Sequence, residues 1–149
     1  MRLLAAALLA SAFLLPPAAL AVDEDTASTL DPDFVAGRKA LADKDWPEAI
    51  KALGRVGLRE PNNADVQNLL GFAWRNTGKY NVAFKHYERA LALDHRHKGA
   101  HEYIGETYLR VGDLKNAEKH LAELRKLCPL GCEPLEDLEK AVAEYRKGK

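Results

Sequence analysis

The sequence predicts an all-α fold: a superhelical array of helix–turn–helix hairpins followed by a C-terminal capping helix. Three observations predict it. Small residues recur at a constant interval along the chain, apolar residues follow helical spacing in both halves of each repeating unit, and a glycine separates the halves in two units. The 149 residues are 47% hydrophobic, which is ordinary for a folded domain and argues against disorder.

Composition and charge exclude several classes of protein. The 22 Lys and Arg residues balance 22 Asp and Glu residues, so the chain lacks the basic excess of a general nucleic-acid binder. We therefore expect no nucleic-acid partner. With 10 Gly, 7 Pro and 2 Cys, the chain also differs from collagen-like, linker-like and disulfide-scaffold proteins.

Residues 1–21 have the order of a secretory signal peptide. A positive start at Arg2 precedes an apolar run over 3–15, and Ala19 and Ala21 are the small residues of a cleavage site. The apolar run of roughly thirteen residues is short for a bilayer span, and an uncleaved anchor is the alternative. We expect cleavage after Ala21, no membrane span thereafter, and a periplasmic or secreted protein; the Ala-rich signal is typical of the bacterial periplasm.

Residues 22–32 are acidic and polar with no apolar face, which predicts a flexible leader. The repeating part follows over 33–131, in three units of about 30–63, 64–97 and 98–131. Small residues mark the same positions of the three units: Gly37, Gly71 and Gly105 in the first half, and Ala49, Ala83 and Ala117 in the second. We expect them to let paired helices approach closely, since a glycine inside a helix otherwise costs about 1 kcal/mol.

Each unit has the pattern of two amphipathic helices joined by a tight turn. In the second unit Gly78 interrupts a helical apolar pattern that restarts at Tyr80. Asp45 and Asp113 stand where the N-cap of a second helix belongs. After the units, residues 132–149 predict a capping helix that begins near Pro134 and covers the last repeat with one apolar face.

These units resemble the tetratricopeptide repeat, whose pattern is W-x₂-L-G-x₂-Y, then A-x₃-F, then P, within a repeat of about 34 residues. Gln67 and His101 stand where the signature Trp belongs, so the resemblance rests on the other positions. It is carried in the first unit by Gly37, Ala49 and Pro61, in the second by Leu70, Gly71, Trp74, Ala83, Tyr87 and Ala90, and in the third by Ile104, Gly105, Tyr108, Ala117, Leu121 and Pro129.

The resemblance implies a non-catalytic periplasmic adaptor or scaffold that binds a protein or peptide in a concave groove. A merely solvated helix face is the alternative. The groove positions of the family fall here on Phe34, Arg38, Asn68, Phe72, Arg75, Asn76, Glu102, Tyr103, Glu106 and Arg110. One subfamily grips a C-terminal carboxylate with Lys, Asn and Arg side chains. Its clamp positions hold Phe34, Arg38, Leu69, Gly99 and Tyr103, of which only Arg38 is cationic, so we expect no clamp.

Cys128 and Cys132 flank a Pro-Leu-Gly turn, and three interpretations stay open. They are a structural disulfide in an oxidising compartment, two free thiols, or a copper or zinc site completed by His101 and His97. The last defines an alternative function as a metal or thiol-redox carrier. We expect His86 and His120 on the exposed surface.

No nucleophile elbow, phosphate-binding loop, zinc-protease helix or dinucleotide fingerprint is present in the sequence. We therefore predict no enzyme activity and no cofactor. The sequence does not determine whether the protein associates with copies of itself.

Overall fold

The computed structural model describes residues 31–148, and within that range the chain forms seven α-helices and no strand. The helices are α2 (Pro32–Ala42), α3 (Trp46–Arg59), α4 (Ala64–Asn76), α5 (Tyr80–Leu93), α6 (Lys98–Arg110), α7 (Leu114–Leu127) and α8 (Glu133–Lys147). The predicted signal peptide 1–21 and leader residues 22–30 lie outside the described residues. The leader was predicted to extend to Pro32, but Asp31 caps α2 and Pro32 begins it.

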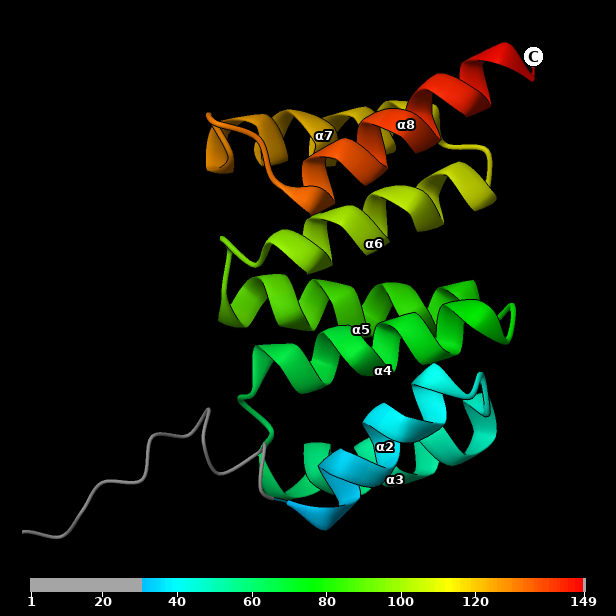
Figure 1. Cartoon of the computed structure of the whole chain (residues 1–149), viewed down its shortest axis with the longest axis vertical. Coiled ribbons are helices and arrows are strands. Elements are labelled where there is room, and N and C mark those ends of the chain that lie inside the picture. The colour runs from blue at the N-terminus through cyan, green and yellow to red at the C-terminus, as the bar shows by residue number, and fades with distance from the viewer. Residues whose placement is uncertain (1–30, 149) are drawn as a thin grey trace, which may run out of the picture.

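The helices form three consecutive hairpins, α2–α3, α4–α5 and α6–α7, that stack along the long axis of the molecule (Figure 1). Helix α8 packs on both α6 and α7 and so continues the array by one helix. The predicted all-α hairpin array with a C-terminal capping helix is confirmed. No helix in the range 31–148 is long and apolar enough to cross a membrane.

Short polar side chains set where most of the helices begin. Asp45 accepts a hydrogen bond from the backbone N–H of Glu48 at 3.2 Å, and Asp113 accepts one from Asn116 at 3.1 Å, which confirms both predicted N-caps. Asn63 does the same for α4. These bonds satisfy N–H groups that have no partner within the helix.

The turn inside each hairpin needs a left-handed residue at one position. Gly78 and Gly112 occupy it with φ of 77° and 83°, and Lys44 occupies the equivalent position of the first hairpin with φ of 59°. Glycine adopts this conformation without strain, whereas a side chain crowds the backbone there. The first hairpin therefore stores strain in its turn that the other two lack.

Each repeated glycine on the first helix of a hairpin lies against a large side chain of a neighbouring helix. A Cβ added to Gly71 would lie 2.6 Å from the ring of Tyr87 on α5, and one on Gly37 would lie 2.6 Å from Leu53 on α3. These two confirm the predicted close approach within a hairpin. Gly105 differs, because the side chain against it is Leu138 of α8, at 2.6 Å from an added Cβ. The capping helix thus packs directly against the backbone of α6 at Gly105.

The apolar face of α8 completes the core of the last hairpin. Leu138 and Val142 are buried against Leu121 and Leu124 of α7. The turn that leads into α8 is closed by a disulfide between Cys128 and Cys132, whose Cα atoms are 5.8 Å apart. Burial and the covalent link together fix the direction in which α8 leaves α7.

Candidate functional site

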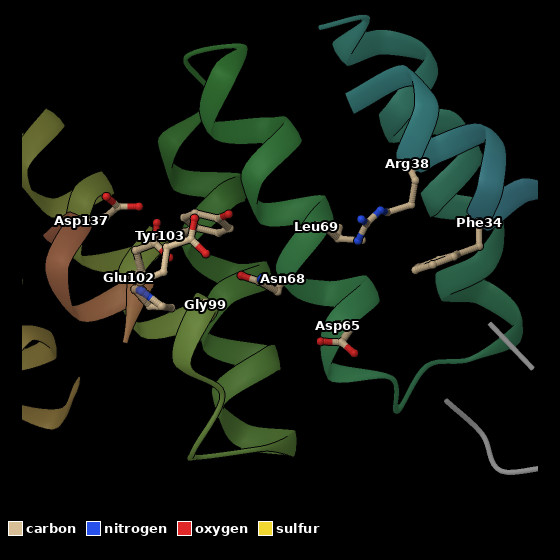
Figure 2. Close-up of a pocket in the computed structure, with 11 residues that line it drawn as sticks. Phe34, Arg38, Asp65, Asn68, Leu69, Gly99, Glu102, Tyr103 and Asp137 are labelled. Carbon is tan, nitrogen blue, oxygen red and sulfur yellow. The ribbon is translucent and has the colours of Figure 1, made fainter. Parts of the chain in front are cut away.

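A hollow of about 450 Å³ opens on the side of the array formed by α2, α4, α6 and α8. Every first helix of a hairpin contributes to its wall, and α8 closes one end (Figure 2). The hollow is lined by Phe34, Arg38, Asp65, Asn68, Leu69, Gly99, Glu102, Tyr103, Glu133, Pro134 and Asp137.

The α2 end of the hollow combines an aromatic ring with a cation. The guanidinium group of Arg38 points from α2 toward Leu69 on α4, and Phe34 lies beside it (Figure 2). Between the α2 end and the α8 end of the hollow, Asp65 is bonded to Nε2 of His97 at 2.9 Å. This bond is the chief reason that the pKa of Asp65 is lowered. Arg38 is thus the cation of this end that has no bonded acid among the described residues.

The α8 end is acidic and holds a buried carboxyl group. Glu102 is 8% exposed and has no hydrogen-bond or ion-pair partner among residues 31–148. Burial, followed by the negative charges of Glu106 and Asp137, raises the pKa of Glu102 to about 8. Asn68, which is 6% exposed, lies in the same wall, and its Oδ1 has no hydrogen-bond partner. Among residues 31–148, neither the carboxyl group of Glu102 nor Oδ1 of Asn68 has a hydrogen-bond partner, and of these only Oδ1 of Asn68 is closed off from solvent.

A second cluster lies beside the hollow and joins the second hairpin to the third. The rings of Phe72 and Tyr103 are 5.0 Å apart, and the ring of Trp46 is 6.0 Å from Phe72. The guanidinium of Arg75 lies 5.0 Å from the centre of the Phe72 ring and forms an ion pair with Glu106. These side chains contact one another within the protein. We name the set of Trp46, Phe72, Arg75, Tyr103 and Glu106 the Arg75 cluster.

The ten predicted groove residues thus divide into two groups. Five line the hollow: Phe34, Arg38, Asn68, Glu102 and Tyr103. The other five lie outside it: Phe72, Arg75 and Glu106 belong to the Arg75 cluster, Asn76 donates to the backbone oxygen of Phe72 at 2.8 Å, and Arg110 is exposed farther along α6. Whether any of the ten contacts a partner stays a prediction.

Sequence reasoning missed the contribution of α8. Glu133, Pro134 and Asp137 line the hollow although this helix was predicted only to cap the last repeat. The signal was present in the spacing, because Glu133 follows Gly99 by one full period of the repeat and Asp137 follows Tyr103 by the same interval. Helix α8 thus occupies the place of a fourth first helix.

All five positions of the carboxylate clamp line the hollow, yet they do not form a clamp. Arg38 is their one cation, and the neighbouring side chains Asp65, Glu102, Glu133 and Asp137 are acidic. The charge of the α8 end is opposite to that needed for a C-terminal carboxylate. That the protein has no such clamp stays a prediction.

The alternative metal site is not assembled. Cys128 and Cys132 are joined to each other, and His97 bonds Asp65 instead of a cysteine. His101 also has other partners, because its Nδ1 lies 2.9 Å from Nδ1 of His120 and its Nε2 donates to the backbone oxygen of His95. Across residues 31–148 no group of three or more His, Cys, Asp or Glu side chains has the arrangement of a metal site. In the structure, each donor of the alternative copper or zinc site has another partner, and the four side chains do not converge.

Two histidines predicted to be exposed are half-buried. Nδ1 of His120 lies 2.9 Å from Nδ1 of His101, which in turn donates through Nε2 to the backbone oxygen of His95. Nδ1 of His86 lies 2.9 Å from Oε1 of Gln67. Burial lowers the pKa of His86, and it lowers that of His120 to about 4. Both side chains therefore pin a second helix to the first helix of its own hairpin.

Comparison with known proteins identifies one repeat and the fold. The family model described as tetratricopeptide repeat matches residues 64–97. No curated protein sequence matches the chain. Solved structures with the same fold include the TPR2B domain of yeast Sti1 in complex with pHsp70, at 16% identity and TM-score 0.72, covering 78% of this chain and 95% of that one.

Two further similar structures are those of SycD and PcrH. SycD, the type III secretion translocator chaperone of Yersinia enterocolitica, has 15% identity and TM-score 0.72 over 85% of this chain and 88% of its own. PcrH, in complex with the chaperone binding region of PopD, has 20% identity and TM-score 0.68 over 85% and 93%. The matched unit is in phase with two further hairpins, so the described part of the chain has the architecture of a tetratricopeptide repeat array.

Proposed function

We propose that this protein is a non-catalytic binding module that holds an extended peptide segment of a partner protein in the hollow. The observation that carries the proposal is that four helices from separate units line one continuous hollow with Phe34, Tyr103 and Asn68. Aromatic rings and amide groups are the side chains that suit an extended peptide, whose backbone presents donors and acceptors throughout. None of the catalytic motifs sought in the sequence is present.

The similar structures support this proposal. The yeast Sti1 domain is bound to pHsp70, and PcrH is bound to a region of PopD. At 16% and 20% identity to this chain, they establish its fold. Self-association stays a further outcome that partner capture would detect.

We also propose that the protein acts after export, in the periplasm or outside the cell. The order of charge, apolar run and small residues over 1–21 supports this location, as does the Cys128–Cys132 disulfide, since such bonds persist in oxidising compartments. The intact mass of protein from its native cells tests both points. We expect a chain that begins at Val22 and is two hydrogens lighter than its reduced form; a retained Met1 would contradict export by cleavage.

Site-specific crosslinking tests the binding proposal. A p-benzoylphenylalanine in place of Phe34 keeps an aromatic ring in the hollow, and the same substitution at Leu58, which is 85% exposed on α3 and outside the hollow, is the matched control. After irradiation of native cells, we expect one defined product from position 34 that is missing from position 58. Identical products from both positions, or none from position 34, would contradict the proposal.

A further inference from the structure

The α8 end of the hollow holds a carboxyl group that the fold leaves unsatisfied. Glu102 is more than nine-tenths buried, and no described side chain or backbone group bonds its oxygens. A buried polar group without a partner is costly, and natural folds rarely retain one without a reason. Replacement of Glu102 by an apolar residue would remove that cost, so its presence here points to a ligand.

A neighbouring group is unsatisfied in the same wall. Asn68 on α4 is also more than nine-tenths buried beside the hollow, and its Oδ1 accepts no hydrogen bond. The carboxyl oxygens of Glu102 and Oδ1 of Asn68 are both acceptors. A ligand that satisfies them must supply donors, and one carrying positive charge would satisfy Glu102 best.

The surrounding charges favour a cation over a neutral donor. Glu106 on α6 and both Glu133 and Asp137 on α8 lie near Glu102 and make its surroundings negative. The positive charge that acts on Glu102 is that of Arg75 on α4, which is already paired with Glu106. Farther along the hollow stand Asp65 with its partner His97, and Arg38 at the opposite end.

The same groups are unsuited to a metal ion. Residues 31–148 contain no group of three or more His, Cys, Asp or Glu side chains placed to hold one. A metal ion needs its ligands to meet around one point. An organic cation does not, because a single ammonium or guanidinium group can donate to several separate acceptors. A lysine or arginine side chain also suits the hollow, since its apolar stem can lie along the wall while the charged head reaches the acid.

We propose that the α8 end of the hollow is a subsite for a lysine or arginine side chain of the bound peptide, with Glu102 as its counter-ion and Asp137 and Glu133 at its rim. This inference rests on the proposed peptide-binding function and names the chemistry that the peptide must carry. It predicts the reverse of carboxylate recognition, because the partner would present a basic residue where a clamp would take an acidic terminus.

Binding of such a cation should release a proton. The pKa of Glu102 is raised to about 8 in the unoccupied protein, so most of this group is neutral at pH 7 and ionises when a cation arrives. Affinity for a basic peptide should therefore rise about tenfold per pH unit between pH 6 and 7.5. His97 also reaches the hollow, through its bond to Asp65. The pH dependence of the affinity must therefore disappear in Glu102→Gln and persist in His97→Gln.

The experiment begins with peptides selected at pH 7.5 from a displayed library of random twelve-residue sequences, with the mature chain as bait. We expect the selected peptides to share one lysine or arginine position. The strongest binder is then synthesised with that residue and with norleucine in its place. We expect the norleucine form to bind the wild-type protein at least about tenfold more weakly, while Glu102→Gln binds the two forms about equally.

Glu88→Gln is the matched control, because it makes the same carboxyl-to-amide replacement at an exposed position on α5 outside the hollow. It should retain the preference for the basic peptide. Selected peptides without a common basic residue, or an unchanged preference in Glu102→Gln, would overturn this inference alone, provided that Phe34→Ala still weakens binding. If the library yields no binder at all, both the inference and the proposed function fail.

Discussion

Arg75 on α4 and Glu106 on α6 form an ion pair across the boundary between the second and third hairpins. The Arg75 side chain is 11% exposed, and its guanidinium also lies over the rings of Phe72 and Tyr103. Both residues were predicted to bind a partner, yet their charges are used within the protein. The main structural role of the two residues is to join the second hairpin to the third.

Replacement of Arg75 by alanine should destabilise the array. The change leaves Glu106 unpaired in a half-buried position and removes the cation from two aromatic faces, so we expect a loss of about 2–3 kcal/mol in the free energy of unfolding. Urea unfolding followed by circular dichroism measures it. Arg110→Ala, at an exposed position on α6, should change stability by less than about 0.5 kcal/mol. Equal effects of the two variants would contradict a structural role for the ion pair.

Gly71→Ala should cost about 1–3 kcal/mol, because the new Cβ would lie 2.6 Å from the ring of Tyr87, which is fully buried and cannot withdraw. Gly54→Ala is the matched control on α3. Its Cβ would meet nothing within 4 Å, so better helix propensity should stabilise the protein by about 0.5–1 kcal/mol. Thermal unfolding of both variants checks the opposite signs, and two changes of the same sign would refute the close-packing argument.

Lys44→Gly should stabilise the first hairpin. Lys44 is exposed and has φ of 59°, at the position where the other two hairpins have glycine. Relief of the left-handed strain should exceed the added freedom of the unfolded chain and give a gain of about 0.5–1 kcal/mol. Denaturant unfolding measures the gain. Lys79 is equally exposed but has a negative φ, so Lys79→Gly should be neutral or destabilising; a gain there of the same size would contradict the explanation.

Glu102→Gln should make stability less dependent on pH. The pKa of Glu102 is about 8 in the folded protein and near 4.5 when unfolded, so the folded state holds the proton more tightly and wild-type stability falls as pH rises from about 4.5 to 8. The variant lacks this loss. At pH 8 it should exceed the wild type by about 1–2 kcal/mol, a value reduced from the full shift because water in the hollow screens the charge.

Unfolding curves of the two proteins at pH 5 and pH 8 test this sign. The difference should be small at pH 5, where Glu102 is largely protonated in the folded state and the penalty is absent. A difference that is larger at pH 5 than at pH 8 would mean that Glu102 is ionised and stabilised in the unoccupied protein. It would also remove a support of the cation subsite.

Local features of the sequence were sufficient for the architecture. Asp45 and Asp113 cap their helices as predicted, because capping depends on residues only a few positions apart. The repeated glycines mark close contacts with a neighbouring helix, although that helix is α8 for Gly105. The groove was recovered in part. Asn68, Glu102 and Tyr103 line it as predicted, whereas Arg75 does not, since its partner Glu106 lies on another hairpin.

By itself, the sequence determined an array of hairpins with a constant period, the ends of its helices and the face of each helix that meets the core. Only the tertiary structure decided that α8 lines the hollow, that the histidines and cysteines have separate partners, and that Glu102 has no bonded partner among residues 31–148. The physical reason is distance along the chain. Helical spacing places a residue on a face, but the neighbours that bury, charge or bond it come from other hairpins, and their approach is settled when the hairpins pack.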